Sequence, residues 1–148
     1  MKPLYVLLVT FVLALTGYWL WNQEWQPVFS GNVAMCAMLL FTALGHFLFP
    51  AGMAQMLPPF IPFRRELIWL TGLLEVAGAI GLLIPEYRHL TAGCLIIFLL
   101  FVLPTNVYAA IHHIDYQKGT NDGPGPAYLW VRVPLQLFFI GWIWYFSW

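Results

Sequence analysis

The chain has 148 residues, of which 8% are charged and 61% hydrophobic, and its six basic residues balance its six acidic ones. Soluble domains carry about 25% charged residues, so this composition excludes a water-soluble fold and predicts a surface that largely faces lipid. Zero net charge without a basic run gives no reason to expect a nucleic-acid partner.

Five segments are long and apolar enough to cross a membrane, since a spanning helix needs about 20 apolar residues. They predict an all-α transmembrane helical bundle that forms a single domain over residues 1–148. Lys2 precedes the first segment, as in a secretion signal, but no small-x-small cleavage site is clear, so we expect a retained helix. The predicted spans are 4–21, 31–49, 67–84, 90–111 and 127–148.

The distribution of basic residues predicts the orientation, because basic residues in short loops stay cytoplasmic. Five spans place the N-terminus and the loops 50–66 and 112–126 on one side. We therefore expect a cytoplasmic N-terminus in a multi-pass protein of the bacterial plasma (inner) membrane. The shared side carries Lys2, Arg64, Arg65 and Lys118, and the other side carries only Arg88 among the loop cations.

Two ionisable residues lie inside the predicted spans, Glu75 near the middle of the third and Arg132 about two turns into the fifth. A charge in hydrocarbon is costly, so such a residue usually faces the bundle interior and has a partner. At about 1.5 Å of rise per residue, Glu75 lies roughly 13 Å and Arg132 roughly 8 Å from the cytoplasmic ends of their helices. We expect the two groups at comparable depth.

Three more polar residues extend this group. Gln136 follows Arg132 by one turn on the same helix face. His46 and Asn106 lie close to the cytoplasmic ends of helices that run in the other direction. If the helices alternate in direction, five polar side chains from four helices meet in the cytoplasmic half of the bundle.

The residues around Glu75 are small. Thr71 and Gly78 share a helix face with Glu75, and Gly72 and Ala79 lie beside that face. Small residues let a neighbouring helix approach closely. We therefore expect an enclosed, inward-facing carboxylate.

The fourth span carries Pro104 two residues before Asn106. Proline has no amide hydrogen to donate, so the carbonyl of Leu100 should remain unpaired. This predicts spare hydrogen-bonding capacity at the depth of the polar group.

Two interpretations of the polar group remain open. In the first, Glu75 and Arg132 form a buried ion pair, saturated by His46, Asn106 and Gln136, that only fixes helix packing. In the second, the same five residues bind a polar headgroup or a quinone-like ring. Buried ion pairs stabilise poorly compared with apolar packing, and ionisable residues inside membranes are usually functional.

The loop 50–62 is too apolar for a free loop and too rich in proline for a spanning helix. We expect it to lie in the membrane interface beside the polar group. It would be either a plain interfacial anchor or a lid over a lipid-facing entrance, to which flexible methionine side chains are suited. The candidate lid residues are Met53, Met56, Pro58 and Pro59.

Metal and disulfide chemistry are not expected. Adjacent His112 and His113 at a helix end point in different directions, and Asp115 is the only acid beside them. Cys36 and Cys94 are far apart in apolar runs, form no CxxC motif, and are interpreted as packing residues. Whether the two thiols meet is open.

Four short pieces of the sequence occur in a recognisable order from about residue 34 to the C-terminus. They are Gly45-His46-Phe47 with Pro50 and Met56-Leu57-Pro58-Pro59; Thr71-Gly72 with Glu75 and 78–85; Phe101-Val102-Leu103-Pro104 with Asn106 and Tyr108; and 129–136. Together these pieces resemble the DoxX-like family of small integral membrane proteins.

The resemblance implies a four-helix core over residues 29–148, to which 1–28 add an N-terminal helix and loop. That family has been linked to thiosulfate:quinone oxidoreduction and to membrane oxidoreductase complexes, and distant relatives include a receptor-assembly chaperone. This chain departs from the family by its additional helix, and it has no cysteine pair or cofactor motif of its own.

Three hypotheses of function follow. The first is a quinone- or lipid-binding accessory subunit of a membrane redox system, with quinone as the possible cofactor. The second is an assembly factor or chaperone without chemistry of its own. The third is proton-transfer catalysis on a hydrophobic substrate by Glu75 and His46. The expected partners are membrane lipid, other membrane or redox proteins, and a second copy of the chain.

Overall fold

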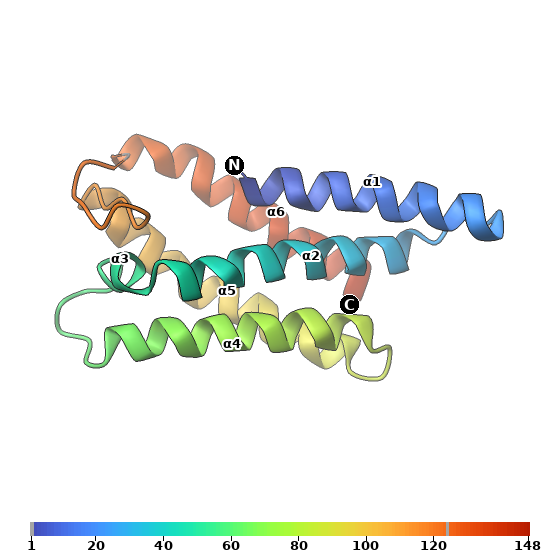
Figure 1. The fold of residues 1–148 in the computed structure, drawn as a ribbon, viewed down its shortest axis with the longest axis horizontal. Coiled ribbons are helices and arrows are strands. Elements are labelled where there is room, and N and C mark those ends of the chain that lie inside the picture. Colours follow the sequence, from blue (N-terminus) through green and yellow to red (C-terminus); the bar gives the residue numbers. More distant parts are fainter. Residues whose placement is uncertain (1, 124) are drawn as a thin grey trace.

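A computed structural model describes residues 2–123 and 125–148 and confirms the all-α prediction (Figure 1). Within these residues there is no strand, and five helices are long and apolar enough to cross a membrane. The long helices are α1 (Lys2–Asn22), α2 (Pro27–Leu48), α4 (Arg64–Leu83), α5 (Arg88–Ile111) and α6 (Leu129–Ser147). The short ones are the α-helix α3 (Pro50–Ala54) and the 3₁₀ helix η1 (Pro126–Tyr128).

The helix ends differ from the predicted spans by a few residues. α2 begins at Pro27 rather than at residue 31, because a proline in the first turn costs the helix no hydrogen bond. α4 begins at Arg64, since a helix continues through polar residues beyond the hydrocarbon as long as its backbone groups are paired. α6 is shorter than predicted and follows η1, which takes up the first residues of the predicted span.

Helix α2 is central to the bundle. It packs against α1, α4 and α6, and 50% of its most apolar stretch is buried. α5 closes a four-helix core by packing against α4 and α6. The helices alternate in direction, so that the last turns of α2 and α5 and the first turns of α4 and α6 lie at the end that carries α3 (Figure 1).

Helix α1 is peripheral to this core. It packs against α2, but it begins alongside the middle of the bundle and extends past the start of α2 (Figure 1). Only 6% of its most apolar stretch is buried, and Leu7 is its one buried side chain. Phe11 adds an edge contact to Trp142 of α6, with ring centroids 5.0 Å apart. Most of α1 is therefore left to face lipid.

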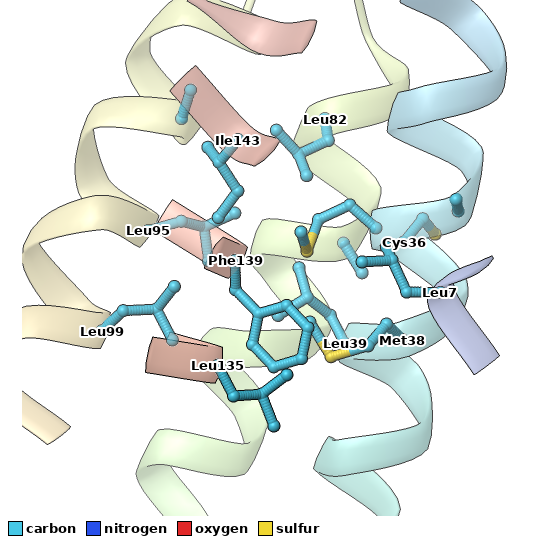
Figure 2. Packing of buried hydrophobic residues seen from close by; sticks show 14 residues of the cluster. Leu7, Cys36, Met38, Leu39, Leu82, Leu95, Leu99, Leu135, Phe139 and Ile143 are labelled. Atoms are coloured by element: carbon cyan, nitrogen blue, oxygen red, sulfur yellow. The ribbon is translucent and has the colours of Figure 1, made fainter. Parts of the chain in front are cut away.

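The interior between the helices is mainly apolar (Figure 2). Leu39 of α2, Leu82 of α4 and Ile143 of α6 are at most 1% exposed. Phe139 and Leu135 of α6 project into the same cluster. Because lipid tails are as apolar as leucine, these contacts stabilise the bundle by close packing rather than by removal from water.

Glycines in α4 allow its close approach to two neighbours. A Cβ atom on Gly72 would lie 2.8 Å from the Cβ of His46, and one on Gly78 would lie 2.6 Å from Leu95 Cδ2. Gly72 therefore fixes the spacing of α4 to α2, and Gly78 its spacing to α5. The small-residue face predicted around Glu75 is confirmed, with Glu75 between the two contacts.

We expect Gly72→Ala to lower the free energy of unfolding by about 1–3 kcal/mol, because the added methyl group overpacks the α2–α4 interface. The matched control is Gly141→Ala in α6, where an added Cβ would meet nothing within 4 Å. Denaturation in detergent, followed by tryptophan fluorescence, measures both variants. Equal stability of the two would contradict the observed helix spacing.

Candidate functional site

A buried ion pair joins helices α2 and α4. His46 Nε2 of α2 lies 3.4 Å from Glu75 Oε2 of α4, and this is the only ion pair between side chains in the described part of the chain. Both residues are less than a tenth exposed. A carboxylate in this position needs such a partner, because an isolated charge in hydrocarbon is costly.

The other edge of the His46 ring is held by α4. Its Nδ1 atom lies 3.0 Å from the carbonyl oxygen of Ile68 and 3.0 Å from Thr71 Oγ1. The Thr71 hydroxyl donates to the same Ile68 carbonyl at 2.8 Å. Both nitrogens of the ring are thus engaged, and its orientation toward Glu75 is fixed.

The Glu75 carboxylate has a second partner on α2. Thr42 Oγ1, one turn before His46, lies 3.2 Å from Glu75 Oε2 and 3.0 Å from the carbonyl oxygen of Leu39, and its single proton can be donated to either. Both contacts use the Oε2 atom, so Oε1 keeps its capacity to accept a hydrogen bond from another donor. Sequence reasoning missed Thr42, although its place one turn before His46 on the same helix face was a usable signal.

A second polar chain connects α5 and α6. Arg132 Nη2 donates to Asn106 Oδ1 at 3.5 Å, and Asn106 Nδ2 donates to Gln136 Oε1 at 2.8 Å. Gln136 Nε2 then donates to the carbonyl of Leu99 at 2.5 Å. Asn106 and Gln136 are buried and Arg132 is half-buried.

The five predicted residues therefore form two clusters instead of one. The pair cluster consists of His46, Glu75, Thr42 and Thr71 between α2 and α4. The amide cluster consists of Asn106, Gln136 and Arg132 between α5 and α6. All five predicted positions are helical: His46 is in the last turn of α2, Asn106 in the last two turns of α5, Arg132 and Gln136 in the first half of α6, and Glu75 near the middle of α4.

The Glu75–Arg132 ion pair of the first interpretation is wrong, because Glu75 pairs with His46. Arg132 is only three residues from the start of α6, roughly 4.5 Å along the axis, whereas Glu75 is eleven residues, roughly 16 Å, from the start of α4. Because both helices begin near the same end (Figure 1), the two groups differ in depth by several ångströms. His46 occupies the place predicted for Arg132.

Spare backbone capacity near Pro104 was predicted at the carbonyl of Leu100. The carbonyl that receives a side-chain donor is instead that of Leu99. Leu99 is seven residues before Asn106 and so lies on the helix face that packs against α6. The carbonyl that accepts this hydrogen bond is therefore determined by which face of α5 packs against α6, and not only by the amide hydrogen that Pro104 lacks.

A further polar group lies at the opposite end of the bundle, and sequence reasoning missed it. Asn32 Nδ2 donates to the carbonyl of Phe146 at 3.0 Å, and Ser147 Oγ donates to Asn32 Oδ1. Trp142 Nε1 donates to the carbonyl of Gly31 at 3.0 Å. These bonds fasten the end of α6 to the start of α2. The alternation of helix directions already placed these ends together.

The candidate lid is partly built into the fold. Residues 50–54 form α3, which packs against α4, and the chain there meets the loop after α5, where a Cβ on Gly52 would collide with the carbonyl of Tyr116. Met53, Met56 and Pro58 are half-buried and Pro59 is exposed.

No group of three or more metal-ligand side chains occurs among the described residues, which include His112, His113 and Asp115. The two cysteines do not meet as a disulfide; Cys36 is buried and Cys94 is exposed.

Two apolar grooves lie on the outer faces of the bundle, and neither includes a residue of the two polar clusters. Leu8, Val9, Val12 and Leu13 of α1 line one groove. The other groove lies on α6 and is lined by Phe138, Gly141, Trp142, Tyr145 and Phe146. These apolar surfaces suit acyl chains.

Comparison with known proteins gives one family. A family model described as Domain of unknown function (DUF8561) matches residues 35–147, more than two thirds of the chain. The match begins in α2 and includes every residue of the pair and amide clusters. No curated protein and no solved structure matches the chain.

The revised pairing predicts a specific pattern in double-mutant cycles. We expect His46→Leu and Glu75→Met to show an interaction energy of about 1–3 kcal/mol in the free energy of unfolding, because each alone leaves the other buried without its partner. Arg132→Met and Glu75→Met should add within about 0.5 kcal/mol. Denaturation in detergent measures both cycles, and a larger coupling to Arg132 would reverse the assignment.

Proposed function

The chain belongs to the family described as Domain of unknown function (DUF8561), and from its buried polar contacts we propose that it binds a hydrophobic ligand with a hydrogen-bonding head. The head would be of the quinone or lipid class and would lie inside the four-helix core. As the DoxX-like resemblance implies, the protein would serve as an accessory subunit of a membrane redox system.

This proposal rests on two groups with unused hydrogen-bonding capacity, one as an acceptor and the other as a donor. Glu75 engages its two partners through Oε2 alone, which leaves Oε1 as an acceptor. Arg132 has five N–H donors, and its contact with Asn106 uses one, at the long distance of 3.5 Å. Structural polar groups in a membrane interior are normally satisfied by one another, so this surplus supports a role toward a ligand.

A quinone-class head matches these groups. Its carbonyl oxygens would accept hydrogen bonds from Arg132, or in the reduced form its hydroxyl groups would donate to Glu75, since the two groups lie in separate clusters. The amide cluster would keep Arg132 in place through Asn106, which is itself held by Gln136. A lipid head with an anionic or carbonyl group would use Arg132 in the same way.

The segment around α3 would guard the access of the ligand. Met53, Met56 and Pro58 are half-buried, and this segment directly follows the last turn of α2, which carries His46. Methionine side chains adapt readily to different shapes, so they would suit a lid that moves with a ligand's tail.

The same end would face the cytoplasm in a bacterial inner membrane. Its loops and helix starts carry Arg64, Arg65 and Lys118, whereas Arg88 lies at the opposite end. This asymmetry supports the orientation by the positive-inside rule.

An assembly factor without chemistry is the second candidate. Phe60 and Phe63 are 83% and 76% exposed just before α4, and Phe63 holds a left-handed backbone with φ 54°. A bulky residue in that conformation is a strained outlier that surrounding structure must maintain. Contact of these rings with a partner protein would supply such a constraint.

The proposal predicts that the amount of quinone or lipid that co-purifies with the protein falls from its wild-type level in Glu75→Met and Arg132→Met. We expect at least a tenfold loss of bound ligand, since each substitution removes a group that hydrogen bonds the head. Native mass spectrometry in a mild detergent measures the occupancy.

Thr105→Val is the matched control, because the hydrogen bond of the Thr105 hydroxyl among the described residues goes to the carbonyl of Val102 in its own helix. Its ligand content should equal that of the wild type. A ligand-free wild type that co-purifies with a membrane protein would favour the assembly role instead, and Phe60→Ser with Phe63→Ser should then release that partner.

A further inference from the structure

A group of cationic and aromatic side chains lies where the chain enters α4. Arg65 is exposed, and its guanidinium carbon lies 5.5 Å from the centroid of the Trp69 ring, one helical turn further on. Arg64 precedes it and is half-buried. Phe60 and Phe63, in the segment just before α4, have largely exposed rings. We call these five residues the arginine surface.

Both guanidinium groups keep most of their hydrogen-bond donors. Arg64 Nη1 donates to the carbonyl of Leu57 at 3.4 Å, which is a single long contact. Arg65 meets Trp69 through the face of the ring, a cation–π contact that directs no N–H group to an oxygen. Because each guanidinium has five N–H donors, the arginine surface can donate several hydrogen bonds to an acceptor outside the chain.

The protein supplies no counter-charge to these two cations. In residues 2–123 and 125–148 the one ion pair between side chains is that of His46 and Glu75. Glu66 is adjacent to Arg65 in sequence, but consecutive residues of a helix do not face each other. The positive charge of the arginine surface therefore favours an anionic occupant.

The rest of α4 continues this surface as an apolar stripe. Trp69, Leu73, Ala77 and Ile80 follow Arg65 at intervals of three or four residues, and all four are exposed. Residues at this spacing lie on one face of a helix.

The stripe is long enough to line one leaflet of a bilayer. α4 is one of the helices long and apolar enough to cross a membrane. At about 1.5 Å of rise per residue, Ala77 lies roughly 18 Å along the axis from Arg65. Half of a hydrocarbon core is roughly 15 Å thick. The stripe therefore runs from a cation at the membrane surface to about the middle of the bilayer.

A phospholipid matches both parts of this face. Its phosphate accepts hydrogen bonds from guanidinium groups, whose geometry suits phosphate. Its acyl chain packs along the stripe, with the Trp69 ring at the boundary where amphipathic aromatic rings settle. An acidic protein segment in water would match the cations only, because it offers nothing to the apolar stripe. The choline of a zwitterionic lipid would bring a further cation to the unneutralised arginines, which favours an anionic head.

We propose that the arginine surface binds an anionic phospholipid, with the phosphate at Arg64 and Arg65 and an acyl chain along the outer face of α4. The adjacent Phe60 and Phe63 insert into the membrane interface and hold the segment before α4 there. This site uses no residue of the pair or amide cluster, so it does not depend on the ligand proposed for the core.

Native mass spectrometry of delipidated protein tests the site with two lipids of equal acyl chains, the anionic palmitoyl-oleoyl phosphatidylglycerol and the zwitterionic palmitoyl-oleoyl phosphatidylcholine. We expect the wild type to bind phosphatidylglycerol more tightly. Arg64→Gln combined with Arg65→Gln should weaken that binding by about tenfold or more, because each basic side chain near a membrane surface adds to the attraction of an anionic head. Phosphatidylcholine binding should not change.

The matched control removes two cations from elsewhere. Lys2→Gln combined with Lys118→Gln changes the net charge equally through exposed residues outside the arginine surface, and its affinity for phosphatidylglycerol should equal that of the wild type. Arg65→Gln alone keeps the contact of Arg64 with Leu57 and covers the case in which the double arginine variant fails to fold; we expect a loss of about threefold or more. Equal losses in the arginine and lysine variants overturn the site, since binding would then follow net charge alone.

The Arg132→Met variant separates this site from the one in the core. Phosphatidylglycerol should bind to it with unchanged affinity, because Arg132 belongs to the amide cluster. If that binding disappears, the lipid lies in the core, and the arginine surface is overturned while core binding stands. Equal binding of the two lipids by the wild type also overturns the site. So does an arginine variant that loses a co-purifying protein but no phosphatidylglycerol.

Discussion

A carboxyl group in the interior of a lipid-facing bundle must be enclosed and partnered, and the arrangement of α2 and α4 meets this requirement at Glu75. Gly72 lets α4 approach α2 closely enough for His46 and Thr42 to reach the carboxylate. The same contact holds the imidazole ring between α4's backbone and the acid. The position of the central helix and the chemistry of the site thus depend on one interaction.

Polar contacts also fix how the other helices assemble, because apolar surfaces alone do not distinguish a neighbouring helix from lipid. The amide cluster aligns α5 with α6 near one end of the bundle. At the other end, Asn32 and Ser147 align α6 with α2. Between these points the core is filled by leucine, isoleucine, methionine and phenylalanine side chains (Figure 2). α1 has a single buried side chain and adds little to this framework.

The division into two clusters bears on function. A single saturated network would have explained every polar residue as packing. Instead, Glu75 is paired through one oxygen and Arg132 through one long hydrogen bond. Among the described residues, the pair cluster thus leaves a carboxyl oxygen, and the amide cluster leaves guanidinium N–H groups, without a hydrogen-bond partner. Under the function proposed above, these are the groups that an oxygen-bearing ligand head would engage.

Composition and hydropathy by themselves determined that the chain is an all-α bundle with five spans, because a charge-poor chain in lipid must pair its backbone within helices. They also identified Glu75, His46, Asn106 and Gln136 as buried polar residues, since charged or amide groups inside apolar runs are conspicuous. Only the tertiary structure decided which groups meet. The depth of a residue in the bundle depends on where its helix begins. Because α6 begins only three residues before Arg132, Arg132 lies at a different depth from Glu75. Partners such as Thr42 and the Ile68 carbonyl depend on helix rotation and spacing, which hydropathy does not encode.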